Sequence, residues 1–440
     1  MRVTLFLLPL FALLIAGFDG NAADRRPDKS RLVVMTFNGE FLWDGRPPEE
    51  GQVNFAWKNS PDEADERLQA IAGIIAAHNP DIVNLVEVEG LTALEHLNST
   101  FLSGRGYAAY LLKGKDSFTG QDVGLLTRID PEGGAIERDD RSGRSGSTLK
   151  SVSKNYFAKL DVGERKIALI GIHYLSRPAD LSRLHQRQAQ ADATLNQARE
   201  LAAAGYGIII LGDFNDYTGE QAALDINDHA PITDVMARLQ GMDPGTPDDD
   251  LVNALRFVPK AQRYTSYWDR DEDSRIDEPQ EYSAIDHILI SGALTEYIAW
   301  VHIDHGHDPR KLTDHFPVIV RFDFPGVASG PDGQAAVKIA WLLPNPVGDE
   351  RQNEAAAVMN TGLATVSLTG WTLRDAAGRT WSLDALGTLA AGQSAEIMRA
   401  GQPMSLNNAG DRVDLLDGSG AIRDSVSYGP SGEGERVEFQ

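Results

Sequence analysis

The 440-residue sequence contains no cysteine. This absence excludes disulfide bonds, thiolate metal sites and a cysteine nucleophile. Any bound metal ion must therefore be held by oxygen atoms or by imidazole. Basic residues are also scarce, because 41 Lys and Arg face 64 Asp and Glu and leave a net charge of −23. Such a surface repels polyanions at long range, although bound divalent ions would reverse the field locally.

Long apolar runs are absent except at the start of the chain. Val3–Gly17 is apolar, follows Arg2, and is followed by small residues at positions 20–23. This pattern is typical of a signal peptide. The run of about 15 residues is interrupted by Pro9 and is shorter than the ~20 residues of a membrane-spanning helix. We therefore expect residues 1–23 to be a signal peptide, the mature protein to be secreted or periplasmic, and integral membrane association to be absent.

The length of the chain predicts two domains, because it exceeds what one hydrophobic core usually organises. Residues 24–325 combine apolar runs typical of strands with a few helical patterns, which indicates a layered sandwich. The Gly- and Pro-rich stretch Phe324–Gln334 predicts a linker, which we place at residues 326–336. Residues 337–440 contain short alternating runs between turn signals, which indicates a small all-β sandwich.

The first domain is expected to begin with a strand followed by a capped helix. Ser60 and Glu63 have the spacing of a capping box, and Pro61 occupies the first helical position. A second helix is predicted from about residue 92, and a third, polar one over residues 179–204. Strands are predicted at residues 32–37, 82–86, 107–112, 123–127, 156–162, 167–174, 208–211, 287–290 and 318–322.

Four of these apolar runs are followed by side chains capable of chemistry: Asn38, Glu87, His173 and Asp213. Strand ends held by a rigid scaffold are where functional sites are usually built. Taken alone, each has an ordinary structural explanation, since Asp and Asn favour turns and a strand-end carboxylate is common. Their joint occurrence is what indicates a site.

Five motifs occur in the order found in one enzyme superfamily. They are Asn38-Gly39-Glu40, Val86-Glu87-Val88, Gly212-Asp213-Phe214-Asn215, Ile285-Asp286-His287 and Thr313-Asp314-His315. Over residues 31–324 the chain resembles the endonuclease/exonuclease/phosphatase superfamily. The resemblance implies an α+β fold of the DNase I-like type, in which two packed β-sheets are flanked by helices.

The residue types suit metal-assisted hydrolysis of a phosphoric ester. This chemistry needs a cation on the phosphate oxygens and an activated water. Mg²⁺ or Mn²⁺ binds through one or two carboxylates plus substrate and water. Glu87 fits as the metal ligand, with Asn38 and Asp314 as neighbours, and the resemblance implies the same assignment. In some relatives a carboxylate two residues after the asparagine, here Glu40, also lies near the metal.

The resemblance also implies the roles of the other motif residues. His315 would act as a base or phosphate contact, oriented by Asp286, while Asp213 and Asn215 would position the nucleophile and the phosphate. The sequence does not decide which group deprotonates the water.

Two further residues are expected near the phosphate. His173 matches the histidine that DNase-like members carry at a strand end, where it serves as an acid or a phosphate contact, and Asp122 is a candidate to orient it. Lys154 lies where such members often carry an arginine that binds substrate phosphate, which is a departure because lysine offers a point charge instead of a fork. A solvated surface lysine remains an alternative.

The acidic run Asp269–Asp277 spaces carboxylates at its first, third, fifth and ninth positions, which keeps a Ca²⁺ site open. It lacks the central glycine and terminal glutamate of an EF-hand loop. A solvated loop on the substrate side is the favoured interpretation.

The C-terminal region resembles the lamin-tail domain, an immunoglobulin-like sandwich. The matching segments are residues 343–346, 354–360, 368–373, 406–408 and 413–417. Trp371 is expected in its core. The resemblance implies an accessory binding or anchoring role for this domain.

The leading functional prediction is a secreted, metal-dependent nuclease whose partner is DNA, with RNA as a second substrate. Within enzymes, the alternative is a sphingomyelinase-like phosphodiesterase or phosphatase that acts on lipid head groups or small phosphate esters. Outside enzymes, the alternative is a binding module whose catalytic site has decayed, against which the retained histidines and carboxylates argue. The sequence makes no prediction of the oligomeric state.

Overall fold

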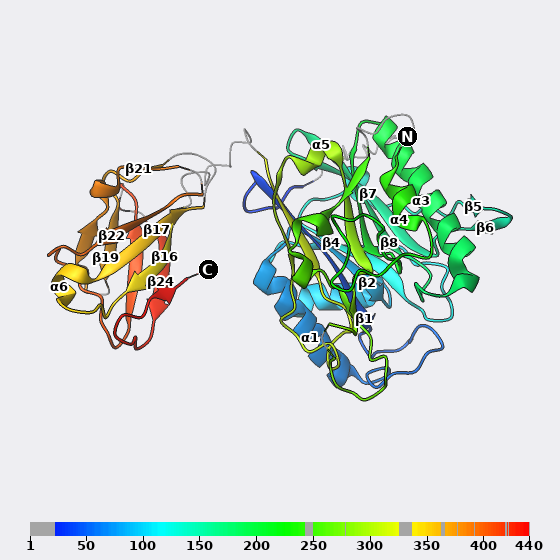
Figure 1. The fold of residues 1–440 in the computed structure, drawn as a ribbon, viewed down its shortest axis with the longest axis horizontal. Helices are drawn as coiled ribbons and strands as arrows, with labels where there is room; N and C mark the ends of the chain where they lie inside the picture. The colour runs from blue at the N-terminus through cyan, green and yellow to red at the C-terminus, as the bar shows by residue number, and fades with distance from the viewer. Residues whose placement is uncertain are drawn as a thin grey trace, which may run out of the picture. The chain divides into compact units, whose positions relative to one another are not determined.

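The computed structural model describes residues 23–242, 250–277, 279–324, 337–361, 366–375, 377–390, 392–418, 420 and 422–439. The predicted signal peptide, except for residue 23, and the predicted linker lie outside the described residues. The chain divides into two compact units, formed mainly by residues 31–323 and 324–440 (Figure 1). Among the described residues, no helix combines the length and the apolar content needed to cross a bilayer.

A six-stranded sheet forms the first half of the N-terminal unit, in the order β14-β15-β1-β2-β4-β3. Its strands are β1 (Arg31–Leu42), β2 (Ile82–Val88), β3 (Ala108–Leu111), β4 (Asp122–Thr127), β14 (Ile298–Ile303) and β15 (Val318–Asp323). Helices α1 (Pro61–His78) and α2 (Leu91–His96) cover one face, where a core cluster joins Leu68 and Ile71 to Met35 and Val83.

Helix α1 begins where the sequence predicts, but not for all the expected reasons. Pro61 occupies the first turn, and the N-cap residue Ser60 makes no side-chain cap hydrogen bond. The expected capping box with Glu63 is therefore wrong. The carbonyl of Ser60 instead accepts the first helical bond from the backbone N–H of Ala64 at 2.9 Å. The helix ends at the left-handed Asn79 (φ 47°), whose N–H donates to the carbonyl of Ile75.

A five-stranded sheet forms the second half, in the order β10-β13-β9-β8-β7. Its strands are β7 (Lys154–Val162), β8 (Arg165–His173), β9 (Gly207–Asp213), β10 (Leu251–Asn253) and β13 (Asp286–Ser291). Helices α3 (Leu184–Ala203) and α4 (Val235–Gln240) cover its outer face through a second core cluster that includes Leu195, Ile170 and Ile210. The predicted polar helix thus starts later than expected, after a 3₁₀ turn at Leu181–Arg183.

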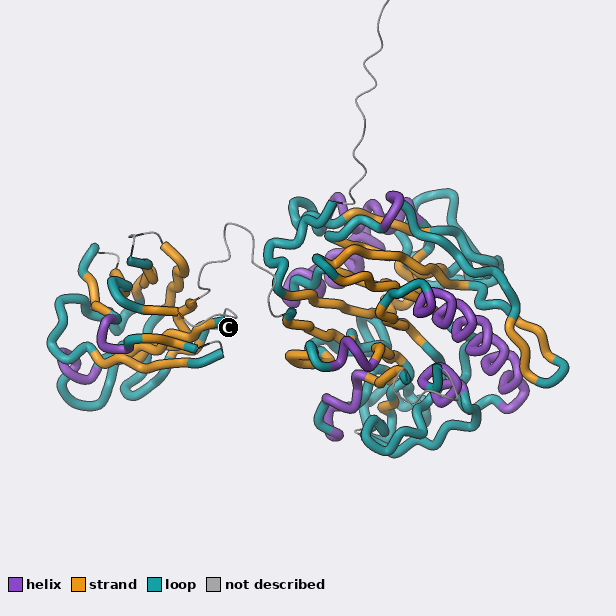
Figure 2. The backbone as a smooth tube through the Cα atoms, turned by 90° about the horizontal axis from the view of Figure 1, so that it is seen from above, coloured by secondary structure: helices purple, strands orange, loops and turns teal. Residues whose placement is uncertain are grey.

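The two sheets pack face to face. A Cβ atom at Gly171 of β8 would clash with Asn84 of β2 and with Tyr156, so the close approach requires glycine. Figures 1 and 2 show the strands enclosed by helices, with α1 on one side and α3 and α4 on the other. This arrangement confirms the predicted DNase I-like sandwich of two sheets flanked by helices. Smaller elements are α5 (Gly292–Thr295) and the hairpins β5 (Gly143–Ser145) with β6 (Thr148–Lys150) and β11 (Ser266–Tyr267) with β12 (Tyr282–Ser283).

The C-terminal unit is an all-β domain, as predicted. One sheet has the order β22-β17-β16-β25 and the other β20-β19-β23-β24. Trp371 and Trp381 are buried in its core, so Trp371 is a core residue as expected. Its elements are β16 (Val337–Leu343), α6 (Glu350–Asn353), β17 (Ala355–Asn360), β18 (Val366–Ser367), β19 (Thr372–Asp375), β20 (Thr380–Ser382), β21 (Thr388–Leu389), β22 (Ser394–Met398), β23 (Asp411–Leu416), β24 (Ile422–Tyr428) and β25 (Val437–Glu438).

Candidate active site

Strand pairing brings the sequence motifs to one edge of the two sheets. In the first sheet β1 and β2 are parallel, and Asn38 pairs with Val86, the residue before Glu87. In the second sheet β8 and β9 are parallel, and His173 pairs with Asp213. Because parallel strands end at the same edge, these side chains meet, and the antiparallel partners bring Lys154 opposite His173 and Asp286 opposite Asp213.

Irregular backbone turns the acidic side chains of the first sheet toward this edge. Glu87 has a left-handed backbone (φ 65°), and the pairing of β2 with β4 shifts register around it. Glu40 and Phe41 are also left-handed (φ 49° and 53°), where the register between β1 and β2 shifts. Bulges of this kind re-aim side chains, and left-handed non-glycine residues concentrate at functional sites.

The carboxylate of Glu87 is held by three hydrogen-bond donors. Asn38 Nδ2 lies 3.3 Å from Oε1, and the backbone N–H of Phe41 donates to Oε2 at 3.2 Å. Gln121, which the sequence analysis missed, donates from its side-chain amide to the same Oε2. Burial raises the pKa of Glu87 against the opposing charges of Lys154 and His315.

Asn38 is the centre of the arrangement and is almost fully buried. Its Nδ2 lies 3.2 Å from Oδ2 of Asp213 and 3.4 Å from Nε2 of His315. Its Oδ1 accepts from the backbone N–H of Glu40, and its carbonyl accepts from the hydroxyl of Thr313 at 2.9 Å. One amide thus contacts residues from both sheets.

His315 and Asp286 form a close buried pair, as the resemblance implied. Nδ1 of His315 lies 2.7 Å from Oδ2 of Asp286, and the hydroxyl of Thr265 accepts from the backbone N–H of Asp286. Nε2 of His315 faces the site, 3.9 Å from Oδ2 of Asp213 and 3.7 Å from Oδ1 of Asp314. Burial lowers the pKa of His315, but the three surrounding carboxylates outweigh it and hold the pKa well above its usual value.

His173 lies across the site from Asp286. Its Nε2 is 3.8 Å from Oε1 of Glu87 and 3.6 Å from Oδ2 of Asp213. Burial, with the positive charges of Lys154 and His315, holds its pKa well below the usual value. Within the described residues Nδ1 of His173 is buried without a hydrogen-bond partner.

Asp122 does not orient His173, so that expectation is wrong. Oδ1 of Asp122 accepts from the backbone N–H of Gly114 at 2.5 Å, and Oδ2 pairs with Lys113 at 3.0 Å. The start of β4 therefore anchors the loop at Lys113 instead of the histidine.

Lys154 is buried, which excludes the alternative of a solvated surface lysine. Its Nζ donates to Oε1 of Gln121 at 3.3 Å and lies 3.4 Å from Oδ2 of Asp116. Gln121 thereby links the ammonium group of Lys154 to the carboxylate of Glu87. The departure from arginine noted in the sequence leaves a buried point charge beside Gln121 and Asp116.

Asp213 and Asn215 shape the turn after β9. The backbone N–H of the left-handed Asn215 (φ 47°) donates to Oδ1 of Asp213 at 2.8 Å. One amide hydrogen of Asn215 is directed to the carbonyl of Tyr174 at 3.3 Å. Burial and the neighbouring Asp286 raise the pKa of Asp213 to about 8.

Glu40 and Asp314 lie at the more open side of the site. Glu40 pairs with Arg67 at 3.4 Å, and the guanidinium of Arg67 stacks 3.6 Å above the ring of Trp57. Burial and the charge of Asp314 raise the pKa of Glu40 to about 7. The side chain of Asp314 is 40% exposed. Arg67 and Trp57 belong to no recognised motif, so sequence reasoning missed them.

The donor set fits a hard divalent cation. Burial raises the pKa values of Glu40, Glu87 and Asp213, and repulsion from neighbouring carboxylates adds to the rise. A bound cation would relieve this repulsion. Mg²⁺ needs only one or two protein carboxylates, so Glu87 would hold it, with Asn38 orienting that carboxylate through its amide N–H.

A second group of possible ligands lies beside the predicted metal residues, whose role stays a prediction. Among the described residues, the compact group here with ligand atoms within 4.8 Å of one another is Asp213, Asp286 and His315. Glu40, Glu87 and Asp314 do not form such a group. Because His315 and Asp286 are hydrogen-bonded to each other, we assign this pair to proton transfer and Glu87 to metal binding.

The acidic run does bring Asp269, Asp271 and Asp273 within 4.8 Å of one another. All three carboxylates accept hydrogen bonds from the loop itself, from the backbone N–H groups of Ser274, Asp273 and Arg275 respectively. These bonds account for the loop without an ion, and a Ca²⁺ site here stays a prediction.

Two aromatic residues of the segment Tyr264–Trp268 have different environments. Tyr264 is stacked between Tyr282 and His305, with ring centroids 4.1 and 3.7 Å away, so it is a packing residue. Trp268 is 69% exposed. It follows Ser266, which forms a β-bridge with His315.

Comparison with known proteins identifies both units. Residues 35–315 match the model of the Endonuclease/Exonuclease/phosphatase family, and residues 331–430 match that of the Lamin Tail Domain. No curated protein sequence matches the chain.

Among solved structures, truncated TDP2 from Caenorhabditis elegans is 18% identical with a TM-score of 0.41, over 67% of this chain and 98% of that one. A 3'-5' exonuclease (NExo) from Neisseria meningitidis is 16% identical with a TM-score of 0.44, over 67% of this chain and 100% of that one. An AP endonuclease from Archaeoglobus fulgidus is 16% identical with a TM-score of 0.43, over 66% and 99% of the two chains. Since the family model spans more than half of the chain, this protein belongs to the endonuclease/exonuclease/phosphatase family.

Proposed function

We propose that the protein is a secreted, Mg²⁺- or Mn²⁺-dependent nuclease that hydrolyses phosphodiester bonds in DNA. The observation that carries the proposal is a set of contacts around two groups. His315 and Asp213 contact the amide of Asn38, while His173 and, through Gln121, Lys154 approach the carboxylate of Glu87. Each histidine presents Nε2 toward these groups, and the His315–Asp286 distance of 2.7 Å fixes one of the rings. Membership of the family supports phosphoric ester hydrolysis, and the nuclease assignment is our inference.

The groups of the site have different roles in hydrolysis. When bound, the cation supplies positive charge to the phosphate oxygens and lowers the pKa of water. Asp286 holds His315 so that Nδ1 carries the proton and Nε2 can exchange a proton with water or phosphate. Asp213, 3.9 Å from that Nε2, can accept a hydrogen bond from the attacking water.

Positive charge near the phosphate comes from the chain itself. Lys154 is buried beside Glu87 and His173, where a charge acts through a low dielectric and is screened little by salt. Holding this charge in place lets the site attract one phosphate although the whole protein carries −23.

A polymeric substrate is favoured by an exposed aromatic side chain beside the site. Trp268 is exposed next to the strand that bridges to His315. Aromatic rings of this kind stack on unpaired bases at about 1–3 kcal/mol per base. A small phosphate ester has no base to stack on this ring.

A substrate panel tests the proposal directly. The mature protein is incubated with supercoiled DNA, linear DNA, RNA, sphingomyelin and a chromogenic phosphomonoester, each with Mg²⁺, with Mn²⁺ and with chelator, and with His315→Ala as control. We expect metal-dependent cleavage of DNA that the control lacks. Cleavage of sphingomyelin alone would replace the nuclease by a lipid phosphodiesterase, and no turnover of any substrate would indicate a decayed binding module.

Export is tested separately. The mature chain should begin near Ala23 or Asp24, because small residues precede that point in the sequence. Recovery of protein with an intact Met1 from the medium or periplasm would refute this part of the proposal and leave the catalytic part untouched.

A further inference from the structure

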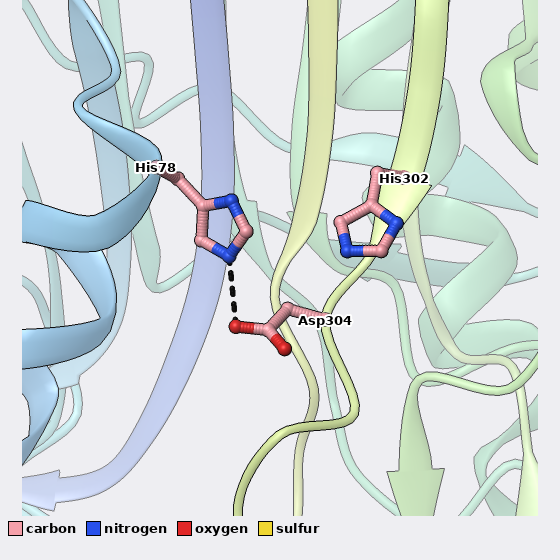
Figure 3. Close-up of side chains that lie close together, drawn as sticks. All are labelled: His78, His302 and Asp304. Carbon is pink, nitrogen blue, oxygen red and sulfur yellow. Dashed lines mark hydrogen bonds and ion pairs between the residues drawn. The ribbon is translucent and has the colours of Figure 1, made fainter. Parts of the chain in front are cut away.

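Three side chains that the catalytic proposal does not use lie together on the N-terminal unit (Figure 3). His78 is the last residue of α1, His302 lies in β14, and Asp304 follows that strand. Nε2 of His78 is 2.8 Å from Oδ2 of Asp304, and the two imidazole rings are 5.6 Å apart between centroids. One ligand atom from each of the three residues lies within 4.8 Å of the others.

We propose that His78, His302 and Asp304 bind a divalent transition-metal ion of the Zn²⁺ class, separate from the catalytic cation. Two imidazoles and one carboxylate are a donor set that Zn²⁺ accepts, with water completing the coordination. Mg²⁺ is disfavoured because it prefers oxygen ligands.

The observed spacing suits such an ion after a small adjustment. Tetrahedral Zn²⁺ with bonds of about 2.0–2.2 Å places its ligand atoms about 3.4 Å apart. The separations seen here start at 2.8 Å for His78 and Asp304 and stay within 4.8 Å for the group. His302 is exposed on an edge strand, so its side chain is free to supply most of the adjustment.

An ion pair alone explains only two of the three residues. His78 and Asp304 satisfy each other, whereas His302 brings a second imidazole to the same carboxylate. The neighbouring histidines have other partners, since Nε2 of His305 contacts the carbonyl of Tyr264 and Nε2 of His307 contacts that of Thr313. They are therefore not the ligands.

The ion would link the end of α1 to the segment that contacts Phe316, the residue after His315. The backbone N–H of Asp304 donates to the carbonyl of Pro317 at 3.1 Å. The rings of His305 and His307 pack against Phe316, with centroids 4.9 and 5.0 Å away. Because Phe316 follows His315 directly, binding at the end of α1 should stabilise this part of the fold.

Calorimetric titration with Zn²⁺ tests the site. The full mature protein, made without a polyhistidine tag and stripped with chelator, is titrated in saturating Mg²⁺ so that the catalytic carboxylates are occupied. The variants are His302→Gln and Asp304→Asn, and His185→Gln removes an exposed histidine elsewhere as the matched control. Co²⁺ absorption spectra report the ligand environment, and circular dichroism checks folding.

We expect one Zn²⁺ per chain, a raised midpoint of thermal unfolding, and affinity weakened roughly 100-fold or more in both site variants, since even outer-shell changes cost about 10–100-fold. His185→Gln should bind like the parent. Absence of Zn²⁺ binding by the parent, or an affinity equal to that of the parent in either site variant, overturns the proposal. So does loss of the bound Zn²⁺ in Glu87→Gln, because the ion would then belong to the catalytic site.

Discussion

At the scale of single residues, the backbone of Glu87 shows how the candidate site is built. A left-handed glutamate inside a strand costs about 1–3 kcal/mol and persists only when its surroundings hold it. Here Asn38, the N–H of Phe41 and Gln121 all bind its carboxylate. This conformation directs the carboxylate of Glu87 to the buried edge of the sheet, where it could bind a cation.

Substitution of Glu87 should lower metal affinity, whereas substitution of His315 should lower kcat. Glu87→Gln removes charge with little change of volume, so metal affinity should fall and excess Mg²⁺ should restore part of the rate. His315→Ala should lower kcat by ~10²-fold or more without metal rescue, as for loss of a positioned proton-transfer group. Initial rates on DNA against Mg²⁺ concentration measure both. Near-parental kcat for His315→Ala at saturating metal would contradict the assigned mechanism.

Asp286 should act only through His315, which it contacts at 2.7 Å. Asp286→Asn should therefore resemble His315→Ala, and the double variant should cost much less than the sum of the single changes, because residues that act as a unit are not additive. Single-turnover rates of the four proteins give the comparison. Full additivity would show that the two side chains work independently.

At the scale of elements, the hairpin β11–β12 supports the loop that carries His315. Ser266 bridges His315, the N–H of Tyr267 donates to the carbonyl of Asp314 at 2.8 Å, and that of Phe316 donates to the carbonyl of Thr265 at 2.7 Å. Substrate stacked on Trp268, which follows this hairpin strand, would lie next to the catalytic loop.

Trp268→Ala should weaken binding of single-stranded DNA. One stacking contact is worth about 1–3 kcal/mol, so KM should rise roughly tenfold, while turnover of a small phosphodiester should stay the same. Trp300→Ala is the matched control, because it removes a partly exposed tryptophan from β14. The idea fails if KM for DNA changes equally in both variants.

The buried histidine in β13 should make stability depend on pH. Nε2 of His287 contacts the carbonyl of Asp216 and Nδ1 contacts the amide of Asn253, so the ring is held neutral, and burial lowers its pKa from 6.5 to about 4. Between pH 4 and 6.5 the ring of His287 binds a proton more tightly in the unfolded chain than in the folded protein. Stability should therefore fall as pH drops from about 6.5 to 4, by up to about 3 kcal/mol from this group.

His287→Gln should flatten that pH dependence, because an amide can keep a donor and an acceptor without titrating. Urea unfolding of parent and variant at several pH values between 4 and 7 isolates the contribution of His287 from other groups. Parallel curves for the two proteins would rule this contribution out.

At the scale of the whole molecule, each unit has its own buried core. The N-terminal unit contains a cluster on the outer face of each sheet, and the C-terminal unit contains a separate one around Trp371 and Trp381. Domains with independent cores can fold alone.

A chain ending at Gly326 should therefore fold and keep its activity on small substrates. Thermal unfolding should stay cooperative, and kcat on a small phosphodiester should match that of the full chain. Loss of cooperative unfolding would show that the second unit is part of the catalytic fold. A change confined to polymeric or surface-bound substrates would support an accessory binding role for the C-terminal unit.

The sequence by itself predicted the fold class, the family and the residues that line the site. These features are local: strand runs, the polar residues that follow them and motif order can be recognised without knowing which strands are neighbours. The sandwich and the all-β second unit were confirmed, and the ten predicted site residues lie around one edge, although Glu40, Glu87 and Asp314 are not a compact ligand group.

Tertiary structure decided everything that depends on contacts across space. Burial of Lys154, the support of Glu87 by Gln121, and the true partners of Asp122 follow from strand register, which no local pattern reveals. The grouping of His78 with His302 and Asp304 likewise requires α1 to end beside β14. Side chains far apart in the chain become partners only when packing fixes the elements that carry them, because burial and distance, not residue type, set their interaction energies.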